Sequence, residues 1–145
     1  MPSTGTALFM VQQINRDNMG LTSDFGHCLM AGENPAQSMS IFASQKKLFG
    51  AQLNDGCCRI AAEDGLIFGS MHPHFALEEM YYLLLHNYDG HVHFDTFPQR
   101  TDPVIEAEKN IYIVKMFWKA AIRLKDDLNI EKDMAVHDAI FVMKL

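Results

Sequence analysis

Histidine is the residue type whose number and spacing most clearly suggest chemistry in this chain. Seven histidines are present, and four of them form two His-x-His pairs, His72/His74 and His91/His93. Residues i and i+2 of a strand point to the same face, so a strand at 91–95 would place His91 and His93 side by side. Neutral imidazoles bind zinc, iron, copper and nickel. We therefore expect either no cofactor or a divalent transition metal held by these four histidines.

The three cysteines, Cys28, Cys57 and Cys58, give a different expectation. An odd count with two adjacent members is a poor disulfide framework, and free reduced thiols are typical of cytosolic or nuclear proteins. No base that the sequence identifies lies near Cys57. The chain also contains no Gly-x-Ser-x-Gly elbow and no glycine-rich phosphate loop. We therefore predict no catalytic residue, and the sequence favours a protein that is not an enzyme.

Aromatic side chains gather near the C-terminal third of the chain. Tyr112, Phe117 and Trp118 lie in a segment with helical spacing of apolar residues. Rings in such a position are more often part of a core or a subunit interface than of a ligand platform. We predict that these three residues form an interface with a protein partner or a second copy of the chain.

Length and composition define the elements that must position these residues. The chain has 145 residues, 48% hydrophobic and 21% charged, which predicts one domain over residues 1–145, with residues 1–7 flexible. A net charge of −6 does not attract phosphate backbones, so nucleic acid is expected only through a complex. No secretory signal and no run of 18 apolar residues is found, which favours an intracellular protein, cytoplasmic or nuclear, without a membrane contact.

The first half of the chain contains two clear local signals. Asn34-Pro35 is typical of a helix start, and this helix is expected to run to about Phe49, with Gly50 as its stop. The Asp-Gly dipeptide at 64–65 predicts a β-hairpin between strands at 57–62 and 66–71. Residues 8–14 fit either a strand or a short helix, and residues 15–34 a loop. The expected fold class is α+β, with an antiparallel β-hairpin or sheet packed against about three helices.

The second half leaves one alternative open. Residues 76–86 fit an amphipathic helix, which we prefer, or a strand that turns into a further strand at 91–95. A long helix is expected from Val104 or Ile111 to Leu128. Residues 139–143 fit a short strand or the last turns of a helix.

Two metal-binding families resemble the histidine pairs. His72-Pro-His74 followed by Glu78 or Glu79 resembles the first motif of cupins, although the second cupin motif has no counterpart. The segment Asp89–Phe94 resembles the first metal motif of amidohydrolases, but that fold is a barrel of about 250 residues. The cupin resemblance implies a metal-binding protein or metal-dependent enzyme that uses the His-x-His pairs.

A third resemblance covers residues 38–128. The segments 66–70, 76–85 and 91–94, followed by Ile111-Tyr-Ile-Val-Lys-Met-Phe-Trp118, resemble the N-terminal region of tRNA-splicing endonuclease structural subunits. Glu78, Glu79 and Tyr82 match that family's helix motif. The family's nuclease residues have no counterpart here. The resemblance implies a non-catalytic interaction or assembly subunit in RNA processing, and this is the function that we expect first.

Overall fold

A three-stranded sheet and six helices make up the residues that the computed structural model describes, 3–60, 64–99 and 101–136. The fold therefore mixes α and β structure, as expected. The elements in chain order are α1 (Thr4–Ile14), β1 (Leu21–Asp24), α2 (Phe25–Met30), α3 (Pro35–Ser44), β2 (Leu48–Leu53), α4 (Pro73–Leu85), β3 (His91–Phe94), α5 (Pro103–Asp126) and α6 (Ile130–Val136).

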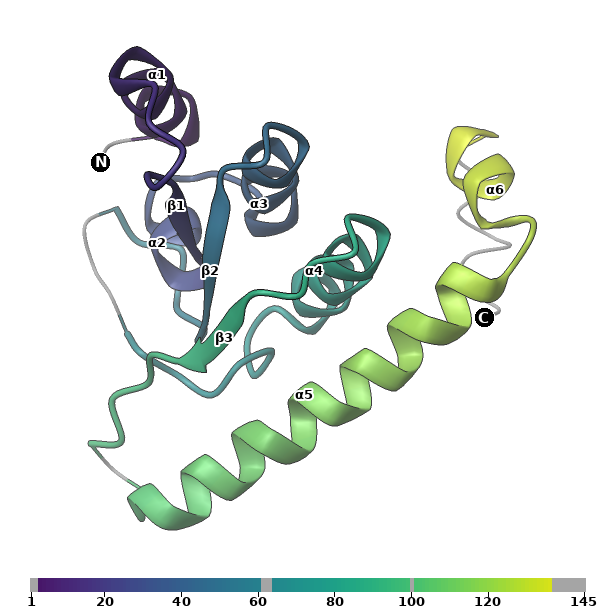
Figure 1. Ribbon diagram of the computed structural model, residues 1–145. Coiled ribbons are helices and arrows are strands. Elements are labelled where there is room, and N and C mark those ends of the chain that lie inside the picture. The colour runs from purple at the N-terminus through teal and green to yellow at the C-terminus, as the bar shows by residue number, and fades with distance from the viewer. Residues whose placement is uncertain (1–2, 61–63, 100, 137–145) are drawn as a thin grey trace.

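The sheet is parallel, so the expected antiparallel arrangement is wrong. Strand β2 lies in the centre, with Ala51 opposite Ser23 of β1 and Val92 of β3. Helices α2 and α3 connect β1 to β2, and α4 connects β2 to β3 (Figure 1). Each such connection returns the chain to the end of the sheet where it began, which makes neighbouring strands parallel.

The predicted hairpin is absent from the described residues. Among the described residues of its two expected strands, only Leu66 pairs, and its partner in this isolated antiparallel bridge is Asp55, which precedes the expected first strand. The backbone N–H of Phe68 instead donates to the side chain of Asn110 on α5, at 3.0 Å. The segment after Leu66 is therefore held by a helix rather than by a strand. Residues 61–63 lie outside the described part of the chain.

The helix that begins after Asn34 ends earlier than expected. The Asn34 side chain accepts a hydrogen bond from the Gln37 N–H at 2.9 Å, which confirms the predicted start. The helix stops at Ser44, and Lys46 adopts a left-handed backbone with φ of 55°. Residues 48–53 consequently form the central strand, where the sequence predicted the end of this helix at about Phe49 and its stop at Gly50.

The N-terminal segment is also more ordered than the sequence predicts. Helix α1 begins at Thr4 because the Ser3 side chain accepts the Thr6 N–H and caps the first turn. This finding selects the helix for residues 8–14 and places residues 4–7, which were expected to be flexible, in the same helix. Residues 1–2 lie outside the described part of the chain. Residues 15–34, expected as a loop, contain strand β1 and helix α2.

The later elements agree with the sequence. Residues 76–85 of the expected helix 76–86 belong to α4, which ends at Leu85. The expected strand is present at 91–94, and the long helix runs from Pro103 to Asp126. Residues 139–143 lie outside the described part of the chain. Among the described helices, none combines the length and the apolar character needed to cross a membrane.

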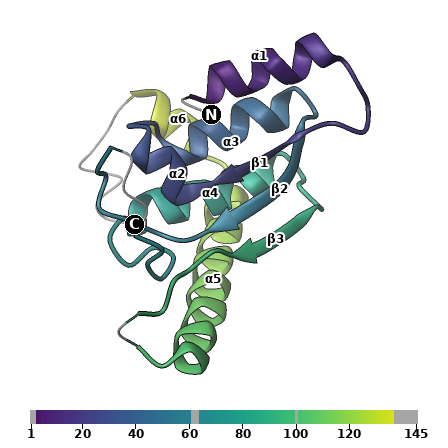
Figure 2. The same cartoon turned by 90° about the vertical axis from the view of Figure 1, so that its left-hand side faces the viewer.

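The core joins the sheet, α4 and α5. Figure 2 shows the three strands in front of α4, with α5 extending beyond them, and α4 packs against α5. The rings of Phe25, Phe68 and Phe117 meet edge to face in this core, at centroid distances of 5.1 and 6.0 Å. This packing fixes the start of α4 relative to the end of β2, and the candidate site lies at that junction.

Candidate active site at Cys58, His72 and Asp55

Asp55 lies two residues after the end of strand β2, and its side chain is fully buried. Its Oδ2 accepts the backbone N–H groups of Met71 and His72, at 2.8 and 2.9 Å. Its Oδ1 accepts the N–H of Gly56 at 2.8 Å and contacts Nδ1 of His72 at 2.7 Å. A buried carboxylate is costly unless hydrogen bonds satisfy it. With four partners, Asp55 is satisfied, and it ties the end of β2 to the start of α4.

His72 is the residue that precedes helix α4 and its ring is held in a defined orientation. A carboxylate accepts but does not donate, so the contact with Asp55 requires a proton on Nδ1 of the imidazole. In the neutral ring, Nε2 is then the acceptor. The ring of Phe75 stacks on the imidazole at 5.8 Å and 9°, which fixes the plane of the ring. The basic nitrogen therefore points in one direction.

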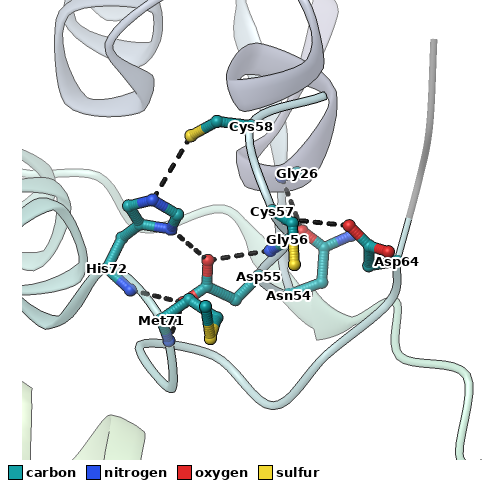
Figure 3. Close-up of polar contacts among 9 residues, drawn as sticks. All are labelled: Gly26, Asn54, Asp55, Gly56, Cys57, Cys58, Asp64, Met71 and His72. Carbon is teal, nitrogen blue, oxygen red and sulfur yellow. Dashed lines mark hydrogen bonds and ion pairs between the residues drawn. The ribbon is translucent and has the colours of Figure 1, made fainter. Parts of the chain in front are cut away.

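Cys58 is the residue at which that nitrogen points. Its Sγ lies 3.3 Å from Nε2 of His72, within hydrogen-bond distance for sulfur (Figure 3). The side chain is exposed, and the backbone is left-handed, with φ of 43°. Left-handed backbone is uncommon for a residue with a side chain, and such residues cluster at functional sites. The thiol is thus accessible and directed toward a base.

Cys57 is exposed like Cys58, but it has neither the contact with His72 nor the left-handed backbone. Its backbone N–H donates to Asp64 Oδ2 at 2.8 Å, and Asp64 also pairs with Arg59. The hydrogen bond from the Cys57 N–H, together with the contact to Arg59, holds the pKa of Asp64 below its usual value. Figure 3 shows the Cys57 sulfur directed away from His72. Two adjacent exposed thiols therefore have different surroundings.

The arrangement is a linear relay of thiol, imidazole and carboxylate. Cys58 and Asp55 contact opposite nitrogens of one ring, so they cannot share a metal ion with that ring between them. Thiol–imidazole–carboxylate arrays of this order occur in enzymes whose cysteine attacks a carbonyl carbon. The described residues contain no group of three or more His, Cys, Asp or Glu side chains placed to hold a metal ion.

The four histidines expected to act together lie on different elements. His72 belongs to the relay, and His74 is exposed in the first turn of α4. His91 and His93 are neighbours on β3, at the edge of the sheet, with ring centroids 5.7 Å apart. The strand geometry predicted for this second pair is therefore confirmed. The bound metal ion stays a prediction, because the described residues contain no cluster of ligands that would support it.

The three residues expected at an interface also separate. Phe117 is buried against Phe68, so its ring is not available to a partner. Trp118 is half-buried and packs against the core. Tyr112 is 64% exposed on the outer side of α5, with the Lys109 ammonium 6.0 Å from its ring.

Sequence reasoning identified His72 but not Asp55 or Cys58. Asp55 stood in an Asn-Asp-Gly segment that indicates a turn, and Cys58 in an expected strand. A cysteine followed 14 residues later by a histidine is not a motif. The available signal was only that Cys57 and Cys58 follow an aspartate in a turn. Compared with known proteins, the chain matches no protein-family model and no curated sequence.

Proposed function

We propose that this protein is a thiol-dependent enzyme of the acyl-transfer or hydrolase class, with Cys58 as nucleophile and His72 as general base. The observation that carries the proposal is the 3.3 Å contact between Cys58 Sγ and His72 Nε2, on a ring whose other nitrogen is tied to buried Asp55. Asp55 acts as a positioning residue, because it fixes the tautomer and the orientation of the imidazole.

The chemistry follows from the positions of the protons. His72 Nε2 takes the proton of the Cys58 thiol, and the sulfur attacks the carbonyl carbon of an ester, thioester or amide. The tetrahedral adduct then expels its leaving group, which takes that proton from His72, and a thioester remains on Cys58. Water attacks this thioester with His72 as base, releasing the acid and restoring the thiol. An alcohol or amine in place of water gives acyl transfer.

The exposure of Cys58 bears on the size of the substrate. The thiol stands on an exposed loop, with Cys57, Arg59 and Ile60 also exposed. An open site of this kind admits an acyl group that is part of a larger molecule. A carbonyl on a flexible chain fits this arrangement better than a small molecule that requires enclosure.

Thiol alkylation tests the proposal directly, because Cys57 provides a matched control in the same loop. Cys58 is expected to react with iodoacetamide at neutral pH about tenfold faster than Cys57, since His72 takes up its proton. His72→Asn removes the base while its amide can still donate to Asp55, and it should abolish the difference. His74→Asn, on the exposed first turn of α4, should leave it unchanged. Equal rates for both cysteines in the wild type would contradict the relay.

A second measurement addresses catalysis rather than reactivity. Incubation with p-nitrophenyl acetate should give an acetyl thioester at Cys58, located by mass spectrometry of the intact and digested chain. Cys58→Ser should lose the adduct and the turnover, and Cys57→Ser should retain both. Acetylation without turnover in the wild type would reduce the site to a reactive thiol and overturn the enzyme proposal.

A second proposal follows from the outer side of α5 and concerns assembly. Ile105, Tyr112 and Met116 are 56%, 64% and 47% exposed, and Ile111 and Ile122 flank them. Two copies of α5 packed antiparallel would pair Ile105 with Ile122 and Ile111 with Met116. The same register pairs Glu108 with Lys119, so the surface is complementary to itself. We therefore propose a homodimer through α5, which would serve the interaction or assembly role expected from the sequence.

Sedimentation velocity tests the dimer. Glu108→Lys should dissociate it, and adding Lys119→Glu should restore it, because the two charges exchange places across the interface. Glu131→Lys on α6 is the control, with the same charge change outside the paired surface. A wild-type chain that sediments as a monomer at all concentrations would contradict the proposal.

A further inference from the structure

A cavity of about 470 Å³ lies outside the thiol relay, between the segment at 64–70 and the start of α5. Its volume is within the range of ligand-binding pockets in proteins. Its lining combines two apolar side chains, Leu66 and Phe97, with two polar ones, Thr101 and Glu106. None of these residues belongs to the relay, so the cavity requires an explanation of its own.

Glu106 is the residue that indicates a ligand. It is 7% exposed, in the first turn of α5, and its Oε2 accepts the hydroxyl of Thr101. Within the described part of the chain, its Oε1 has no hydrogen-bond partner and is shielded from solvent. A buried carboxylate oxygen without a partner costs free energy that a donor would recover. Glu106 lines the cavity, so a rotation of its carboxylate would present Oε1 to a donor bound there.

The second carboxylate of the cavity is already neutralised. Asp64 pairs with Arg59 and accepts the N–H of Cys57. Glu106 forms no ion pair with a described residue. The unbalanced negative charge is therefore that of Glu106, and the net charge of −6 adds a field that favours cations.

The apolar part of the wall fits the body of an organic cation. Phe97 is 42% exposed, and its N–H donates to the Gly65 carbonyl at 2.8 Å. A Cβ on Gly65 would stand 2.3 Å from the Phe97 ring, so glycine at this position lets the ring pack against the loop. A half-exposed aromatic face beside a carboxylate binds a cation by both charge and π interaction.

We propose that this cavity binds an aliphatic ammonium or guanidinium group, with Glu106 Oε1 as the acceptor and Phe97 as the aromatic wall. The same chemistry is present in free amines and in lysine or arginine side chains of peptides. The proposal rests on the cavity and Glu106 alone, and it holds whether or not Cys58 is a nucleophile.

Amide chemical-shift titration of the full chain tests the proposal and separates the two sources. Agmatine and butylamine represent free cations, an acetylated and amidated Gly-Arg-Gly peptide represents side chains, and butanol is the uncharged control. Saturable shifts at Gly65, Phe97 and Thr101 are expected with at least one cation and not with butanol. Shifts with the peptide but not with agmatine would assign the site to protein or peptide substrates, and the reverse to small amines.

Glu106→Gln provides the decisive variant, because it keeps the shape and the acceptor for Thr101 and removes the charge. It should weaken binding about tenfold or more, as loss of a charge-assisted hydrogen bond does. Glu131→Gln makes the same change at an exposed carboxylate of α6 that does not line the cavity, so it is the matched control and should bind as the wild type does. Phe97→Leu should weaken binding less than Glu106→Gln. Unchanged binding in Glu106→Gln, or no saturable shift with any cation, would overturn the proposal.

Discussion

The side-chain oxygen of Asn110 accepts a 3.0 Å hydrogen bond from the backbone N–H of Phe68. Both residues are fully buried, and the bond joins helix α5 to the segment that leaves the sheet after Asp55. It takes the place of the strand partner that an antiparallel hairpin would have supplied. The position of this segment, which leads directly to His72, thus depends on an amide side chain 42 residues further along the chain.

Asn110→Ala should destabilise the protein, because it leaves the Phe68 N–H buried without an acceptor. The expected loss is about 1–3 kcal/mol in the free energy of unfolding, measured by urea denaturation. Arg123→Ala, exposed on the same helix and outside the pairs proposed for the dimer, controls for the change in helix composition. A loss no larger than that of the control would show that the hydrogen bond contributes little.

Two glycines with the same backbone angle separate strain from packing. Gly32 and Gly69 have φ of 72° and 71°, but a Cβ on Gly32 would meet no atom within 4 Å. A Cβ on Gly69 would lie 2.5 Å from the ring of Phe117 and 3.1 Å from Ala76. Gly32→Ala should cost about 1 kcal/mol for the left-handed backbone alone. Gly69→Ala should cost clearly more, and equal losses in thermal or urea unfolding would contradict this.

Glu79 should make stability depend on pH. Burial raises the pKa of this carboxyl to about 8, and the charge of Asp24 adds to the rise. The unfolded carboxyl ionises near its usual 4.5, so between these values only the folded state holds the proton. The free energy of unfolding should therefore fall as pH rises from about 4.5 to about 8, by up to about 1.4 kcal/mol per unit. Above that range this contribution should stay constant.

Glu79→Met tests the assignment, because it removes the carboxyl and keeps an unbranched side chain of similar length. Within the described residues neither Glu79 oxygen has a hydrogen-bond partner, so no bond is lost. The variant should be more stable than the wild type near pH 8 and should lose the slope. Glu78→Gln, whose wild-type side chain accepts from Asn34 at 3.0 Å, is the control and should keep it. A slope that persists in Glu79→Met belongs to another group.

Cys28 should be unreactive in the folded protein. Burial raises the pKa of its thiol to about 12, with nearby carboxylates adding to the rise and a hydrogen bond with Ser38 opposing it. Alkylation at mildly alkaline pH should modify Cys57 and Cys58 and leave Cys28 free until denaturant is added. Peptide mapping by mass spectrometry checks this expectation. Modification of Cys28 under native conditions would mean that the region between α2 and α3 opens locally.

Elements specified by local chemistry were predictable from the sequence. The cap at Asn34 and the spacing of Leu77, Met80 and Leu84 depend on residues within one or two helical turns. Strand β2 was not predictable in the same way. Its segment, Leu48–Leu53, contains a glycine and no clear alternation, and parallel pairing joins it to residues about 30 to 40 positions away.

The candidate site was not predictable either, because it also depends on contacts between residues that are distant in the sequence. Asp55 and His72 are 17 residues apart, and they meet only because β2 and α4 pack against one core. The Asp-Gly dipeptide at 64–65 indicated a hairpin. The backbone N–H groups of Leu66 and Phe68, in the expected second strand, donate instead to Asp55 and Asn110. The sequence showed the histidine and not the groups that face its two nitrogens.

The paired backbone hydrogen bonds between Asp55 and Leu66, each 2.9 Å long, bring together the two ends of residues 56–65. In engineering terms this stretch is a cassette: it carries Cys58, whereas Asp55 and His72 stand on the framework that closes it. Loops with joined ends tolerate exchange of length and composition. The proposed nucleophile can therefore be replaced or repositioned by a loop graft, while the imidazole of His72 and the carboxylate of Asp55 remain in place beside the new loop.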